Sequence, residues 1–198
     1  MLHLDGSRFS GSGTIVRFGL PLAALSGQAL RLTQIRARRT PSGLRPQHLK
    51  AAQAVTQLCQ GSLEGASVGS RELIFRPGRL PQGGCFRWDI GTAGSTTMLA
   101  FALLPLAAFA RGRQRFYLTG GLFQDFAPSF FHVQHALLPL VRRMGLQAEI
   151  RMLRPGYVPA GGGRMELTVE PVRGMLRPLS MPQRRGELSY RAGAGSAD

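Results

Sequence analysis

The feature of this 198-residue chain that most constrains its fold is a set of motifs that occurs twice in the same order. Self-similarity at a nearly fixed spacing is typical of a duplicated supersecondary unit. Similar composition in a chain rich in Arg, Gly, Ala and Pro is the alternative explanation, but three ordered matches favour a repeat. The matches are LPLAA at 20–24 and 104–108, QH at 47–48 and 134–135, and R-P-G-x-x-P-x-G-G at 76–84 and 154–162.

Hydrophobic periodicity predicts that each unit reads β-α-β-α-β-β, which is an α+β fold with two layers. We predict a first unit at 1–88, a second at 89–172, and the start of a third with a frayed tail at 173–198. The first unit is expected to have strands at 2–5, 29–35, 71–76 and 84–90 and helices at 12–26 and 46–60. The second is expected to have helices at 94–110 and 128–144 and strands at 113–118, 146–153 and 164–171, with a further strand possible at 172–179.

The charge of the chain favours an anionic partner. The formal net charge is +15, and all but one of its 25 basic residues are arginine, the exception being Lys50. Such a field suits nucleic acid, nucleotide phosphates or an anionic membrane surface, and the planar guanidinium suits phosphate. Codon bias in a GC-rich genome is the alternative cause. Cys59 and Cys85 lack metal-site spacing, and no apolar run is long enough to span a bilayer, so we expect no metal site and a cytoplasmic location.

The segment IRARRTPSGLRPQHL (35–49) is the first candidate site because it places four arginines within ten positions. His48 follows them at the first turn of a predicted helix, where a capping role is the alternative. Glycine-rich turns at 6–14 and 90–97 precede predicted helices and could bind an anion, or serve only as tight turns. Arg17 lies three residues after Thr14 and can face the first of these turns, although a salt bridge or a solvated face is equally compatible. His135, inside an apolar helix, is expected to be structural.

Together these segments resemble the RNA 3′-terminal phosphate cyclases and their cyclase-like relatives in ribosome assembly. The resemblance is carried by LDGS (4–7), IRARRTPSGLRPQHL (35–49), GSRELIFRPG (69–78), IGTAGS (90–95), TGG and AP in 119–128, and RPGYVPAGGG (154–163). It implies β-α-β-α-β-β units around a pseudo-threefold axis, of which about two of three are present here. The fold would be similar to that of the RNA-binding C-terminal domain of a bacterial initiation factor.

The resemblance also implies a ligase-type reaction. ATP, with Mg²⁺, adenylylates a histidine, AMP passes to an RNA 3′-phosphate, and the 2′-hydroxyl closes a 2′,3′-cyclic phosphate. Carried over by position, Arg17, Arg36, Arg39, Gln47 and His48 would hold the RNA phosphate, whereas Arg38 and Arg45 would be solvated charge.

Positions that surround the nucleotide in the family differ here. Ser10 stands for an acid, Thr14 and Phe101 stand for glutamines, and Leu122-Phe123 replaces a Thr-acid pair. Pro128 is followed by Ser129 in place of a second proline, and Phe131 stands for another acid.

These departures leave three hypotheses open. The chain is part of an ATP-dependent cyclase, completed by a separate C-terminal polypeptide that carries the nucleophilic histidine; it is a non-catalytic RNA-binding module; or it is a decaying product whose exposed apolar face drives self-association. In each case we expect no catalytic histidine and no metal ligand in this chain, an RNA partner with a 3′-phosphate, and neither membrane nor DNA as a partner.

Overall fold

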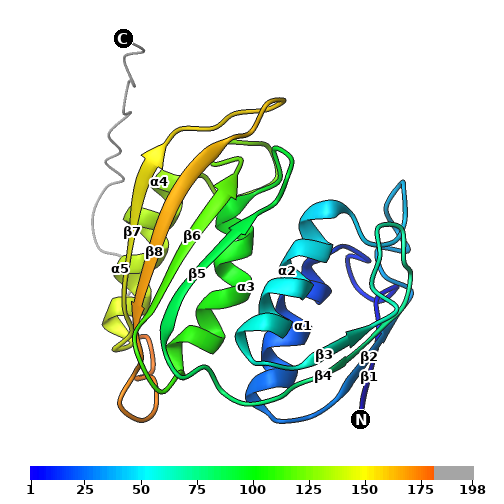
Figure 1. Cartoon of the computed structure of the whole chain (residues 1–198), viewed down its shortest axis with the longest axis horizontal. Helices are drawn as coiled ribbons and strands as arrows, with labels where there is room; N and C mark the ends of the chain where they lie inside the picture. Colours follow the sequence, from blue (N-terminus) through cyan, green and yellow to red (C-terminus); the bar gives the residue numbers. More distant parts are fainter. Residues whose placement is uncertain (181–198) are drawn as a thin grey trace.

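The computed structural model describes residues 1–180, which form two four-stranded sheets with helices between them (Figure 1). The first sheet has the order β1-β2-β4-β3 and the second the order β5-β6-β8-β7. The elements of the first half are β1 (Leu2–Asp5), α1 (Thr14–Leu25), β2 (Leu30–Thr33), α2 (Pro46–Leu58), β3 (Ser62–Glu64) and β4 (Leu73–Arg76). Those of the second are β5 (Gly84–Asp89), α3 (Thr96–Ala108), β6 (Gln114–Gly120), α4 (Phe130–His132), the π-helical turn η1 (Val133–Leu137), α5 (Leu138–Arg143), β7 (Gln147–Arg154) and β8 (Gly163–Glu170).

Both halves share one topology, which confirms the α+β fold class. In each sheet the first two strands are parallel and joined through a helix, and the remaining pairs are antiparallel. Parallel neighbours need such a crossover, whereas antiparallel ones can follow a short turn. The predicted unit boundaries stay a prediction; the sheets themselves run from Leu2 to Arg76 and from Gly84 to Glu170.

The hydrophobic core lies between the sheets. Helices α1 and α2 cover the inner face of the first sheet, and α3 packs against both of them and against β6 and β8 (Figure 1). Leu20 of α1, Leu103 and Leu106 of α3, and Phe116 of β6 are fully buried. Most of α3 is buried, so its continuous apolar sequence reflects a central helix. Within residues 1–180 we find no helix with the length and apolarity that crossing a bilayer requires.

The strand predicted to close the first unit, 84–90, belongs instead to the second sheet. It pairs in parallel with β6, with Phe86 opposite Phe116 and Trp88 opposite Leu118, and these pairs contribute aromatic surface to the second half of the core. The fourth strand of the first sheet is β3 at Ser62–Glu64, which the sequence analysis missed because three residues are too few to show alternation. The possible strand at 172–179 is also wrong: those residues form turns and extended coil.

Only one of the three repeated motifs occupies equivalent places. LPLAA lies in α1 and α3, 84 residues apart, with Pro21 and Pro105 inside the two helices. The helices that follow begin at Pro46 and Phe130, again 84 apart, so His48 corresponds to His132. The Gln-His match at 134–135 is therefore displaced by three residues. R-P-G-x-x-P-x-G-G lies after β4 in one copy but between β7 and β8 in the other.

The helix predicted at 128–144 is interrupted. A π-helical turn, Val133–Leu137, lies next to Pro139, which has no N–H to donate to the carbonyl four residues earlier. His135 lies in this turn and is exposed, which corrects the expectation that it is a structural residue of an apolar helix.

Candidate RNA 3′-phosphate site

A cleft of about 390 Å³ lies where the N-termini of α1 and α2 face the loop that follows β6. We call it the arginine cleft. It brings together all five side chains for which the resemblance predicted a phosphate-binding role, although they come from two helices and a loop. Its lining consists of Ser12, Thr14, Arg17, Arg36, Arg39, Gln47, His48, Met98, Gln124, Asp125, Phe126 and Ala127.

Arg17 is the charged group most removed from water in this cleft. Its side chain projects from α1, one turn after Thr14, and only 8% of the residue is exposed. Within residues 1–180 no carboxylate lies at ion-pair distance from it. Burial, and then the charge of Arg36, lower the Arg17 pKa from 12.5 to about 10. The guanidinium stays protonated at neutral pH, so the fold holds a desolvated positive charge that an anion would stabilise.

His48 is buried and neutral beside this charge. Its Nδ1 accepts a hydrogen bond from the backbone N–H of Arg45 at 3.2 Å, which caps the start of α2. Burial, and then the charges of Arg17, Arg36 and Arg45, lower its pKa from 6.5 to about 3. Because Nδ1 is the acceptor, the proton of the neutral ring lies on Nε2. Nε2 lies against Gly13 at the start of α1, where a Cβ atom would be 2.0 Å away.

Arg36 is held by its own loop. Its backbone has φ of 56°, and its guanidinium donates to the carbonyl oxygens of Pro41 at 2.6 Å and Gly43 at 3.1 Å. Burial, and then the charges of Arg45 and Arg39, lower the Arg36 pKa. Arg39, in contrast, is exposed and has no side-chain hydrogen bond within residues 1–180. Arg36 therefore supports the loop as well as the charge of the cleft, while Arg39 is free to meet a ligand.

The two arginines set aside as solvated charge are both exposed, but one of them has a structural contact. Arg38 donates to the Phe9 carbonyl at 2.9 Å, and its aliphatic part packs over Gly11. It therefore fixes the glycine-rich turn that precedes α1. Arg45 is the N-terminal flanking residue of α2.

Gln47 connects the cleft to the second half of the chain. Its Oε1 accepts a hydrogen bond from the backbone N–H of Ser95 at 3.3 Å, and Ser95 caps α3 by accepting from Met98 N. The next residues of α3 bind the loop after β6: Thr96 Oγ1 donates to the Gly121 carbonyl and Thr97 Oγ1 to the Pro128 carbonyl. The far wall of the cleft is thus tied to the same helix start that Gln47 contacts.

The positions predicted around a nucleotide are dispersed. Only Thr14 lines the arginine cleft. The Ser10 hydroxyl lies 2.9 Å from that of Ser12, Phe101 packs against the core, and the Phe131 ring contacts the Phe123 ring in a tilted arrangement. The side chains that the sequence analysis missed are Ser12, Met98 and those of 124–127. The signal for 124–127 was present, since the segment from TGG to AP had been noted, but only for its departures from the family.

The described residues do not fit a resident divalent cation. Mg²⁺ prefers oxygen ligands, chiefly carboxylates, and Asp125 is the one carboxylate among the residues that line the cleft. In residues 1–180 no group of three or more His, Cys, Asp or Glu side chains could hold a metal ion. The cleft fits an anion instead, because Arg17, Arg36 and Arg39 line it and their charge is positive.

Comparison with known sequences finds one family over most of the chain. The sequence model of RNA 3′-terminal phosphate cyclase matches residues 8–190. A protein of that name from Nitrosospira multiformis is 43% identical over 186 residues, which are 94% of this chain and 52% of the relative. Its namesake in Pseudomonas fluorescens is 42% identical over 197 residues, covering 100% of this chain and 56% of the relative. One from Pyrococcus furiosus is 42% identical over 171 residues, 86% of this chain and 50% of the relative.

The structure thus shows a duplicated α+β scaffold with a cleft lined by arginines. The matches then show that this chain belongs to the RNA 3′-terminal phosphate cyclase family. It spans about half the length of the curated relatives it matches.

Proposed function

We propose that the arginine cleft binds the terminal phosphate of an RNA 3′ end, and that this chain provides the phosphate-holding part of an RNA 3′-phosphate cyclase. The observation that carries the proposal is Arg17, a nearly buried guanidinium that has no carboxylate partner among residues 1–180. Burying a charge costs free energy unless a counter-ion or hydrogen bonds stabilise it. A phosphate at this place would meet the guanidinium groups of Arg17 and Arg39.

In the proposed reaction the residues of the arginine cleft position the phosphate or offset its charge. Arg17 and Arg39 offset its charge, so that the neighbouring 2′-hydroxyl oxygen can approach phosphorus against less repulsion. His48, neutral and buried beside Arg17, adds no competing charge to the cleft. ATP supplies the activating adenylyl group when bound. The described residues do not form a metal site, so Mg²⁺ has no role assigned to this chain.

Binding of matched oligonucleotides tests the proposal. A ten-nucleotide RNA with a 3′-phosphate should bind more tightly than the same RNA with a 3′-hydroxyl, and Arg17→Met should abolish this preference. Arg113→Met is the matched control, because Arg113 is exposed and paired with Glu170. Competition with ATP distinguishes an RNA phosphate from a triphosphate. Equal affinity for the two RNA ends in the unaltered protein would contradict the proposal.

A second function, RNA binding without catalysis, is favoured by one observation. Ser10, Phe101, Pro128 and Phe131, which were expected around a nucleotide, do not line the cleft. Adding the C-terminal half of the Nitrosospira relative, together with ATP and 3′-phosphorylated RNA, distinguishes the two functions. Formation of a 2′,3′-cyclic end supports the cyclase role, whereas tight RNA binding without any cyclic product supports the binding module.

A further inference from the structure

Four aromatic rings form a continuous row on the surface beside the arginine cleft. Ring centroids are 5.2 Å apart between Tyr157 and Phe123, 5.5 Å between Phe123 and Phe131, and 6.2 Å between Phe131 and His135. We call Tyr157, Phe123, Phe131 and His135 the aromatic row. Phe131 is 50% exposed and Tyr157 is 59% exposed. Large aromatic rings left half in water contribute little to the core, so their alignment suggests a ligand.

The backbone holds this row in place. The Leu122 N–H donates to the Gly156 carbonyl at 3.0 Å, and Phe123 forms a parallel bridge with Tyr157. The loop that carries Tyr157 is closed by the Gly161 N–H, which donates to the Tyr157 carbonyl at 2.7 Å. Gly161 packs so tightly on the backbone of Ala93 that a Cβ atom would lie 2.9 Å from it. The rings are therefore preorganised for stacking, which lowers the entropy cost of binding.

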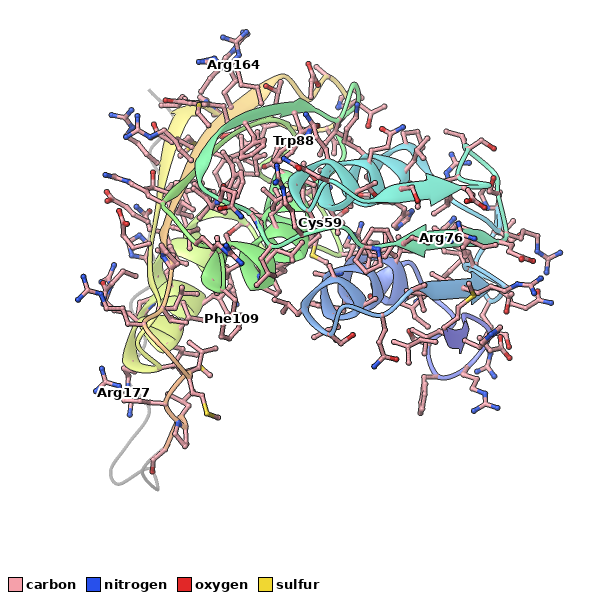
Figure 2. The ribbon with its side chains drawn as sticks, turned by 60° about the horizontal axis from the view of Figure 1, so that its bottom comes forward. Cys59, Arg76, Trp88, Phe109, Arg164 and Arg177 are labelled. Carbon is pink, nitrogen blue, oxygen red and sulfur yellow. The ribbon has the colours of Figure 1, made fainter. Side chains whose placement is uncertain are left out.

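Two arginines that have no acidic partner in the described part of the chain lie at the base of the loop that carries Tyr157. Arg154 ends β7 and Arg164 lies in β8, and they are register partners across the hairpin. We call them the hairpin arginines. Like charges directly opposite each other in a sheet are destabilising unless an anion lies between them. Figure 2 shows Arg164 extending outward from the second sheet.

Three other arginines on or beside the strands of the second sheet have acidic partners. Arg113 pairs with Glu170, and Arg115 and Arg151 both pair with Glu166. No carboxylate in residues 1–180 lies within ion-pair distance of the hairpin arginines. Arg87 of β5 also has no carboxylate at ion-pair distance within residues 1–180, but its guanidinium lies over the Tyr117 ring, 4.6 Å from the ring centroid.

The aromatic row and the arginine cleft share one loop. Gln124 to Ala127 line the cleft, and Phe123 and Phe131 lie on either side of that segment. A chain whose end is held in the cleft can therefore leave it past these rings. Aromatic rings stack unpaired bases of any sequence, and arginines contact the phosphates between them, which is how single-stranded RNA is bound.

We propose that the aromatic row and the hairpin arginines bind the single-stranded nucleotides that precede the RNA 3′ end. The proposal rests on the function proposed for the cleft, but it concerns separate residues. It predicts that bases two or three positions from the end stack on Phe131 or Tyr157, while the terminal phosphate reaches Arg17. Recognition by stacking would be tolerant of base identity.

An RNA that carries 2-aminopurine at the second or third position from its 3′-phosphate tests this directly, because stacking quenches its fluorescence. We expect quenching with the unaltered protein. Phe131→Ala and Tyr157→Ala should each restore the fluorescence and lower RNA affinity about tenfold, equally for 3′-phosphate and 3′-hydroxyl ends. Phe18→Ala, which removes a partly exposed ring from α1, is the control expected to change neither. Arg164→Gln should weaken binding by several-fold, and Arg113→Gln should not.

The outcomes separate the two proposals. Loss of the 3′-phosphate preference in Arg17→Met, with quenching retained, supports both. No 3′-phosphate preference in the unaltered protein, with quenching retained, contradicts the cleft but supports the row. Unchanged affinity and fluorescence in Phe131→Ala and Tyr157→Ala would overturn the row, as would a change of oligomeric state without a change in RNA affinity. If excess ATP restores the fluorescence while the RNA stays bound, the aromatic row binds a mononucleotide. That result would also overturn the proposal for the row.

Discussion

The charge of Arg17 is expected to favour binding of an anion and to disfavour folding. Its guanidinium is buried against the N-terminal turn of α1, and its pKa is lowered to about 10 because burial disfavours the charge. Arg17→Met keeps the length of the side chain and removes that charge. We expect the free energy of unfolding, measured by urea titration, to rise by on the order of 1–2 kcal/mol. Affinity for a 3′-phosphorylated RNA should fall roughly tenfold or more.

A lower stability of Arg17→Met would show that Arg17 already has a stabilising partner in the free protein. Arg31→Met is a useful comparison, because Arg31 is half-exposed and paired with Glu72. Its effect on unfolding should be small, as is usual for surface ion pairs.

His48 predicts a dependence of stability on pH. Its pKa is near 3 in the folded chain and near 6.5 in the unfolded one, so only the unfolded chain takes up this proton between those values. The free energy of unfolding contributed by His48 should therefore be complete above pH 6.5 and fall by about 1.4 kcal/mol per pH unit as the pH drops toward 3. Urea unfolding of the unaltered protein and of His48→Gln, compared from pH 7 to pH 4, isolates this contribution. Parallel pH profiles for the two proteins would contradict it.

At the residue scale, the sequence was informative where chemistry follows a motif. The five predicted phosphate contacts do line one cleft, although their role remains to be measured. What could not be predicted was the support of each side chain. The bonds from Arg36 to the carbonyls of Pro41 and Gly43 depend on a loop conformation with positive φ, which no local pattern in 35–49 encodes.

Helices α1 and α2 meet at their N-termini through a contact that only glycine permits. A Cβ atom at position 13 would lie 2.0 Å from His48 Nε2, so Gly13→Ala must push the two helix starts apart. We expect a loss of stability of about 1–3 kcal/mol and weaker binding of 3′-phosphorylated RNA. Thermal unfolding and RNA titration measure the two effects.

A double-mutant cycle gives the control for this contact. His48→Ala removes the ring that obstructs the new methyl group, so Gly13→Ala should cost much less in that background. The difference between the two costs is the coupling energy of the pair. Simple additivity of the two changes would show that Gly13 acts through its own backbone and not through His48.

The succession of elements was predictable, but the pairing of strands was not. Helix positions followed from 3.6-residue periodicity, and α1, α2 and α3 each end within two residues of the predicted limits. Alternation also located Gly84–Asp89 as a strand, yet it carries no information about which sheet a strand joins. Pairing is decided by the burial of Phe86 and Trp88 against Phe116, contacts between residues far apart in sequence.

The charge of the whole molecule predicts a strong dependence of RNA binding on salt. Each phosphate neutralised on a single strand contributes about −0.7 to the slope of log affinity against log salt concentration. Arg39 is exposed and supports no other residue by a side-chain hydrogen bond in residues 1–180, so Arg39→Ala should reduce the magnitude of the slope by about that amount. Titrations between 50 and 200 mM salt measure it, with Arg76→Ala, which removes an arginine paired with Glu64, as the control. An unchanged slope for Arg39→Ala would place Arg39 outside the RNA interface.

An apolar surface on the first half of the molecule predicts weak self-association. Leu2 and Leu4 of the edge strand β1 and Phe18 and Leu22 of α1 are all more than a third exposed. Unpaired strand edges and exposed apolar side chains favour association. Leu22→Glu should therefore shift the protein toward monomer in sedimentation experiments at high concentration. If the unaltered protein is already monomeric at those concentrations, self-association through this surface is excluded.

The arginine cleft is built from both halves of the chain, since α1 and α2 provide one wall and the loop after β6 provides the other. A ligand bound there would contact both halves of the chain. Its binding free energy adds to the free energy that keeps the two halves docked, so occupancy should slow hydrogen exchange in the C-terminal part of α3, beyond the cleft residue Met98, as well as at the cleft itself. The boundary between the two halves would thus be the place where substrate binding changes the stability of the protein.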